Sequence, residues 1–109
     1  MTENENLIVQ KCINIVKNEK VYVINSAPNW YGVRCDNDVV FVLGKNYDFK
    51  GGVRYTLVIN FEEFKFTDRN IGLEKLHSLC ATKYTEQSKQ MPNREIVALN
   101  FLSKFSKQR

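Results

Sequence analysis

Residues 53–61 alternate between two kinds of side chain, and this pattern restricts the fold more than any other feature of the chain. Every second position is large and apolar: Val53, Tyr55, Leu57, Ile59 and Phe61. Because successive side chains of a β-strand point to opposite faces, the pattern predicts a strand with one apolar face. A lone strand cannot bury that face, so a sheet with a covering layer is required. We expect Leu57, Ile59 and Phe61 to be buried.

Three further segments have the composition of strands: residues 21–25, 31–35 and 39–43. The turn residues Asp36-Asn37-Asp38 separate the second segment from the third and predict a β-hairpin. Residues 44–52 are polar and flanked by glycine, which is typical of a loop. Together these segments indicate consecutive, mostly antiparallel strands.

The alternation changes phase after residue 61. Phe64 and Phe66 follow the opposite parity from the preceding apolar positions. A bulge or tight turn at Glu62 and Glu63 would reverse the phase. We therefore allow for a short fifth strand.

Helical periodicity flanks the strand region on both sides. Apolar residues gather on one side of a helical wheel in residues 6–18, 68–83 and 93–104. Residues 85–92 lack such a period and are expected to form a linker. The candidate N-caps are Asn4 or Asn6, Thr67 or Asp68, and Asn93.

These elements predict one α+β domain over residues 1–109. Its sheet should be mostly antiparallel with four to five strands, packed by one N-terminal and two C-terminal helices. A composition that is 43% hydrophobic and 26% charged is that of a globular chain.

The net charge of +4 comes entirely from residues 83–109, which hold six basic and two acidic residues. A local basic patch favours phosphate contacts, and the candidate nucleic-acid-binding residues are Lys89, Arg94, Lys104, Lys107 and Arg109. The alternative is that these charges complement a helix dipole and solvate a tail. The apolar side of the third helix should pack on the sheet or on a second subunit, which would form a homodimer.

Aromatic residues in and beside the predicted loops are the second group of candidate contact residues. Trp30 and Tyr31 follow a Pro-Asn loop, and Tyr47 and Phe49 lie between lysines in the Gly-flanked loop. Tryptophan and tyrosine are preferred anchors of protein interfaces and also stack on bases. The alternative for Trp30 is that it covers one end of the core.

Catalytic, metal and cofactor motifs are missing from the sequence. The three cysteines form no CxxC pair, which argues against a zinc site or a disulfide framework and indicates a reducing, cytoplasmic environment. No apolar run is long enough to cross a membrane. His77 and Cys80 have helical spacing, but nothing else resembles a triad. We expect no metal and no cofactor.

The sequence therefore favours a small non-catalytic binding protein over an enzyme. Its partner would be another protein, and it would act as an inhibitor, adaptor or regulator. A phage-encoded modulator would fit the size and composition. The alternative is a nucleic-acid-binding protein that uses the basic C-terminal helix and the aromatic loops.

Overall fold

The computed structural model describes residues 2–36, 38–67, 70–90, 98 and 101–102, with the side chains of residues 88–90 left out. The elements, in chain order, are α1 (Glu3–Val16), β1 (Val21–Ala27), β2 (Trp30–Cys35), β3 (Asp38–Tyr47), β4 (Val53–Ile59), β5 (Glu62–Phe66) and α2 (Ile71–Gln90). The predicted α+β class and antiparallel sheet are confirmed. Within the described part of the chain, neither helix combines the length and apolar content that a membrane crossing would need.

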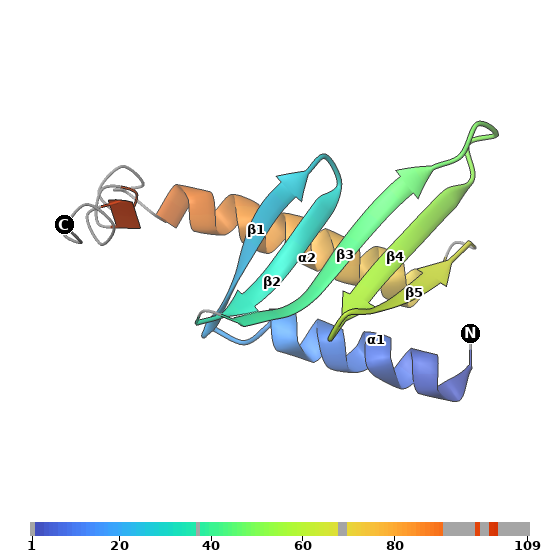
Figure 1. The fold of residues 1–109 in the computed structure, drawn as a ribbon, viewed down its shortest axis with the longest axis horizontal. Coiled ribbons are helices and arrows are strands. Elements are labelled where there is room, and N and C mark those ends of the chain that lie inside the picture. Colours follow the sequence, from blue (N-terminus) through green and yellow to red (C-terminus); the bar gives the residue numbers. More distant parts are fainter. Residues whose placement is uncertain (1, 37, 68–69, 91–97, 99–100, 103–109) are drawn as a thin grey trace.

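The five strands form one meander in which each pairs antiparallel with the next along the chain (Figure 1). Tyr31, Leu43, Leu57 and Phe64 face one another across β2 to β5. This row points to the side of the sheet on which α1 and α2 pack, and Leu43 and Leu57 are fully buried there. The apolar face of the alternating pattern is therefore the core.

Helix α1 begins one turn earlier than predicted because its N-cap is Thr2. The Thr2 hydroxyl accepts a hydrogen bond from the Glu5 backbone N–H (3.1 Å), and the Glu5 carboxylate accepts one from the Thr2 N–H (2.8 Å). This reciprocal capping box satisfies two backbone donors, whereas the predicted caps Asn4 and Asn6 lie inside the helix.

Helix α2 differs from the prediction at both ends. The Asn70 side chain accepts from the Leu73 N–H (3.2 Å) and so provides the N-cap, in place of Thr67 or Asp68. The helix continues to Gln90, so the prediction of a linker over residues 85–92 is wrong for residues 85–90, and residues 91 and 92 lie outside the described residues. Residues 85–90 include good helix formers that lack an apolar face, which hid the helix from a search for periodicity.

The predicted third helix, residues 93–104, lies mostly outside the described residues. The described positions within it are Ala98, Phe101 and Leu102, which are helical and exposed. The described structure therefore has one helix before the sheet and one long helix after it.

A tight turn separates β4 from β5, and it lies at Asn60 and Phe61 instead of Glu62 and Glu63. Both residues have positive φ, 51° and 67°, which is the geometry of a type I′ hairpin turn. The prediction that Phe61 is buried is wrong, because the turn directs its ring into solvent with 99% exposure. Ile59 is half-buried at the end of β4 and packs against the core.

The third strand extends four residues past the predicted strand and includes Gly44 to Tyr47, which we had assigned to a loop. The remaining turn is organised by Asp48, whose carboxylate accepts from the backbone N–H groups of Lys50 (2.9 Å) and Gly52 (2.7 Å). Gly51 supplies the positive φ that this turn requires.

Candidate partner-binding surface

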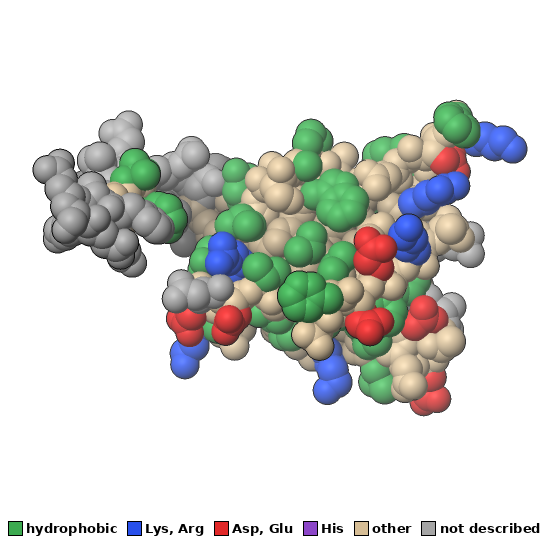
Figure 2. Space-filling view, in the orientation of Figure 1, with side chains coloured by type: hydrophobic (Ala, Val, Ile, Leu, Met, Phe, Trp, Pro, Cys, Tyr) green, Lys and Arg blue, Asp and Glu red, His purple; other side chains and the backbone are tan. Residues whose placement is uncertain are grey.

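The sheet has two chemically different faces, because both helices pack on one of them. No described helix covers the other face, which is turned toward the viewer in Figures 1 and 2 and is called the open face below. Apolar side chains gather near its centre, and most charged ones lie toward its margins (Figure 2). Its central apolar residues, the open-face patch, are Tyr22, Ile24, Trp30, Val42 and Val58.

Trp30 lies flat on the backbone of the neighbouring strand. It is paired with Gly44 in the β2–β3 register, and a Cβ added to Gly44 would fall 2.2 Å from the indole ring. The indole Nε1–H donates to the Asn46 side chain at 3.2 Å. Glycine at position 44 therefore makes room for the ring, and the hydrogen bond fixes its orientation.

Ile24 repeats this arrangement one strand away. Its side chain lies over Gly32, where an added Cβ would come within 3.1 Å of Ile24 Cγ1. Glycine inside a strand weakens it and often marks close approach of another group. Gly32 and Gly44 were the sequence signal for this packed apolar surface, and our sequence reasoning did not use them.

Trp30 and Tyr31, which we had grouped as one contact site, lie on opposite faces of the sheet. Tyr31 faces the helices, where its ring meets His77 edge-on with centroids 5.3 Å apart and lies 6.1 Å from the Tyr84 ring. The structure therefore places Trp30 on the open face and Tyr31 against α2.

Tyr47 and Phe49 lie at the far end of the β3–β4 hairpin and outside the open-face patch. Tyr47 is exposed at the last position of β3, with the Lys45 ammonium 5.6 Å from its ring centroid. Phe49 is fully exposed in the turn that follows. These two aromatics are thus separated along the sheet from Trp30.

The candidate nucleic-acid-binding residues fall largely outside the description. Lys89 belongs to α2, but its side chain is among those left out. Arg94, Lys104, Lys107 and Arg109 lie outside the described residues. Lys83, which contributes to the same local charge excess, donates to backbone carbonyls at the C-terminal end of α1.

His77 occupies a buried position between α2 and the sheet. Its Nε2 lies 3.0 Å from the Asn29 backbone oxygen. A carbonyl can only accept, so Nε2 carries a proton and donates to it. Burial lowers the pKa of His77 below the usual 6.5, the Asn29 bond opposes this shift, and the Lys45 charge adds to it. His77 is therefore a neutral packing residue at neutral pH.

This burial predicts that stability depends on pH through His77. Below pH 6.5 the unfolded chain takes up a proton that the folded protein resists, so the free energy of unfolding should fall as the pH falls from 6.5. The variant His77→Gln can still donate to the Asn29 carbonyl but cannot titrate. Urea unfolding across this range should show a flatter pH profile for the variant, and equal profiles would contradict the assignment.

The two buried cysteines, Cys12 and Cys80, are not activated as nucleophiles. Burial raises the pKa of Cys12 to about 11 and that of Cys80 to about 12. Both thiols therefore stay protonated at neutral pH, and the thiolate is the reactive form. No group of three or more metal-ligating side chains comes together in the part of the chain that the structure describes.

Comparison with known proteins gives no further guidance, because no family model, curated protein or solved structure matches the chain.

Proposed function

We propose that this protein is a non-catalytic binding module that docks on a protein partner through the open face of its sheet. The observation that carries the proposal is the open-face patch: a flat apolar surface in which Tyr22 and Ile24 stay more than one-third exposed. Apolar patches that a fold leaves uncovered mark interaction sites. An inhibitor, adaptor or regulator would act in this way.

Charge around the patch indicates the chemistry of the partner. Arg34, Arg54 and Lys65 occupy open-face register positions, as does the acid Glu63. Lys65 lies in the same cross-strand row as Trp30, and Arg54 pairs with Asn46, which holds the indole. A complementary surface would bring an apolar centre to Trp30 and carboxylates to its basic margin.

Trp30 is the residue of the patch best suited to be a binding hot spot. Its ring is already ordered by Gly44 and Asn46, so docking would restrict little additional side-chain freedom. We expect Trp30→Ala to weaken partner affinity at least about 30-fold, which corresponds to the roughly 2 kcal/mol of a hot spot. Affinity chromatography from the native host, followed by titration of the captured protein, would measure this change.

Two further variants test whether the loss of partner affinity is specific to the open face. Phe61→Ala removes an aromatic ring that is fully exposed outside the patch and should leave partner affinity unchanged. The double change Arg54→Glu and Lys65→Glu spares Trp30 and should weaken the same partner, with little effect on stability. A captured protein whose affinity is indifferent to Trp30 and to these charges would overturn the proposal.

The nucleic-acid alternative depends on the basic residues 83–109. It predicts binding to mixed-sequence DNA or RNA whose affinity falls steeply with salt. The same purification distinguishes the two: bound nucleic acid raises the ratio of absorbance at 260 nm to that at 280 nm. Nucleic-acid binding that survives Trp30→Ala would favour this alternative.

A further inference from the structure

Strand β1 lies at an edge of the sheet. The backbone N–H and C=O of Val23 point away from β2 and are hydrogen-bonded to a side chain. The backbone N–H of Val23 donates to Gln87 Oε1 at 2.9 Å, and the Val23 carbonyl accepts from Gln87 Nε2 at 3.2 Å. Gln87 comes from α2, 64 residues away. One side-chain amide thus satisfies both ladder groups of an edge residue.

A carboxamide has the same donor and acceptor as a peptide group. In an antiparallel ladder, a residue facing outward exchanges both of its backbone bonds with one residue of the next strand. Gln87 makes this pair of bonds at Val23 in place of such a residue. The edge of β1 is therefore already arranged to accept a sixth strand, with one position filled by a substitute from the same chain.

The two edges of the sheet differ in how they discourage pairing. Strand β5 is short and carries Glu62, Glu63 and Lys65, and charges of this kind keep other chains from adding to an edge. Strand β1 is longer and has no charged residue from Val21 to Ala27. Charged side chains therefore protect β5, whereas β1 has none of its own and is met by the Gln87 side chain from α2.

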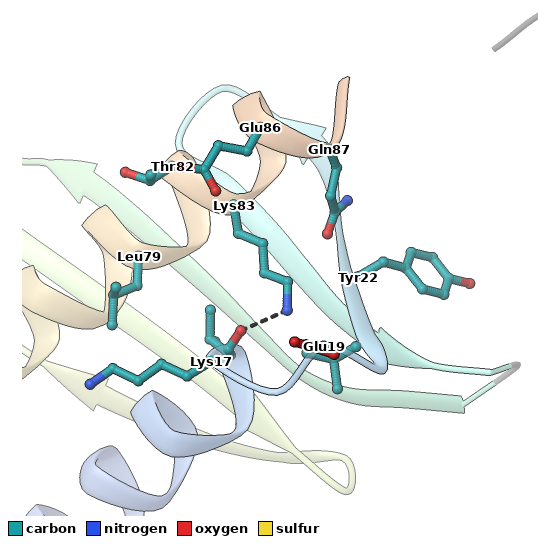
Figure 3. Close-up of a pocket in the computed structure, with 10 residues that line it drawn as sticks. Lys17, Glu19, Tyr22, Leu79, Thr82, Lys83, Glu86 and Gln87 are labelled. Carbon is teal, nitrogen blue, oxygen red and sulfur yellow. Dashed lines mark hydrogen bonds between the residues drawn. The ribbon is translucent and has the colours of Figure 1, made fainter. Parts of the chain in front are cut away.

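A groove of about 960 Å³ borders the start of β1, between the end of α1 and the last turns of α2 (Figure 3). Its apolar lining includes Val16, Val21 and Leu79. Its charged lining is balanced: Lys17, Glu19, Lys83 and Glu86. An uncharged segment with apolar side chains complements this groove better than a strongly charged one.

The position of helix α2 limits what can pair with the β1 edge. The helix passes behind β1, which it contacts, and continues beyond the edge of the strand (Figure 1). The projecting turns would cover the inner face of one added strand. In an edge-to-edge pair of two copies, each α2 would project into the layer that its counterpart's α2 already fills. A single extended segment fits where a second copy does not.

We propose that the β1 edge and its groove bind an extended, uncharged segment of a partner polypeptide as a sixth strand, with Gln87 occupying the edge until that segment displaces it. Recognition would combine main-chain hydrogen bonds at the edge with apolar contacts in the groove. This site is separate from the open-face patch, because it uses the edge of the sheet and not its surface.

The test uses a synthetic peptide of residues 20–28, which contains the β1 sequence and can pair with an open strand edge. With both of its ends blocked, the peptide carries a single charge, on Lys20. Titration followed by ¹H–¹⁵N NMR should show saturable shifts of the Val23 and Asn25 backbone amides and of the Gln87 side-chain amide. The variant Gln87→Ala lacks the amide that competes with the peptide for Val23, so it should bind the peptide up to about tenfold more tightly. That factor corresponds to the net free energy that a hydrogen bond contributes in water.

Two control variants make the outcome decisive. Gln10→Ala removes an exposed glutamine on α1 and should leave peptide affinity unchanged. Trp30→Ala should also leave peptide affinity unchanged. The proposal for the β1 edge and the proposal for the open face can therefore be contradicted independently. Absence of saturable shifts, shifts centred on the Trp30 indole, equal or weaker binding by Gln87→Ala, or dimerisation of the protein through its β1 amides would overturn the proposal.

Discussion

Replacing Leu57 with alanine is expected to lower the free energy of unfolding by about 2–5 kcal/mol. Leu57 is fully buried at the middle of the sheet, where it faces Leu43 on one side and Phe64 on the other. Truncating it removes apolar contacts and leaves a cavity that neighbouring strands cannot close without shifting. Urea unfolding with an unchanged m-value would measure the loss.

Ile59→Ala provides the matched control on the same strand and the same face. Ile59 is only half-buried, because the turn at Asn60 and Phe61 follows it directly. We expect a smaller loss of about 1–2 kcal/mol, since less apolar surface leaves water when this side chain packs. A loss below about 1 kcal/mol for Leu57→Ala, or a larger loss for Ile59→Ala, would contradict the position assigned to the core.

The spacing of the apolar residues predicted the architecture because each strand and helix buries only one of its faces, and apolar residues therefore recur with the period of that element. Alternation over residues 53–59 determined which face of β4 meets the helices, and the same logic identified the apolar face of α1. The ends of the helices were harder to predict from the sequence, because side-chain hydrogen bonds determine where each helix begins. Thr2 and Asn70 cap their helices through geometry that no periodicity reports.

The turn between β4 and β5 shows why an alternating pattern can mislead. Phe61 continues the apolar parity of Val53 to Ile59, yet its φ of 67° ends the strand. Left-handed conformation is unusual for a bulky residue, so the sequence signal for a turn at this position was weak. Asn60, a residue that tolerates positive φ, was the available indication.

The candidate surface was predicted in part. Composition singled out Trp30, but its grouping with Tyr31 overlooked that adjacent residues of a strand point to opposite faces. The sites at the β1 edge could not be foreseen, because Val23 and Gln87 are distant in sequence and glutamine on an exposed helix is unremarkable. Tertiary packing alone brings that amide to the strand.

Lys83 is one of the six basic residues behind the charge excess of residues 83–109, and the structure places it between the two helices. Its ammonium donates to the backbone carbonyls of Val16 (2.7 Å) and Asn18 (2.6 Å) at the C-terminal end of α1, and Figure 3 shows the first of these bonds. The last turn of α1 has no basic residue of its own. Lys83 therefore supplies from α2 the positive charge that a helix C-terminus favours. Burial lowers the pKa of this lysine below its usual value.

Lys83→Met is accordingly expected to lower the free energy of unfolding by about 1.5–3 kcal/mol, the range for hydrogen bonds to a charged group. Methionine keeps much of the apolar stem that lies in the groove but removes the ammonium that donates to both carbonyls, and the Asn18 oxygen then keeps only the Val21 N–H (3.3 Å) of the donors described here. Lys75→Met makes the same change at an exposed position of α2 and should alter stability by less than about 0.5 kcal/mol. Because these bonds join α1 to α2, hydrogen exchange at the C-terminal end of α1 should also accelerate in Lys83→Met alone. Equal stabilities for the two variants would contradict this role, because they would show that Lys83 contributes no more than a solvated charge.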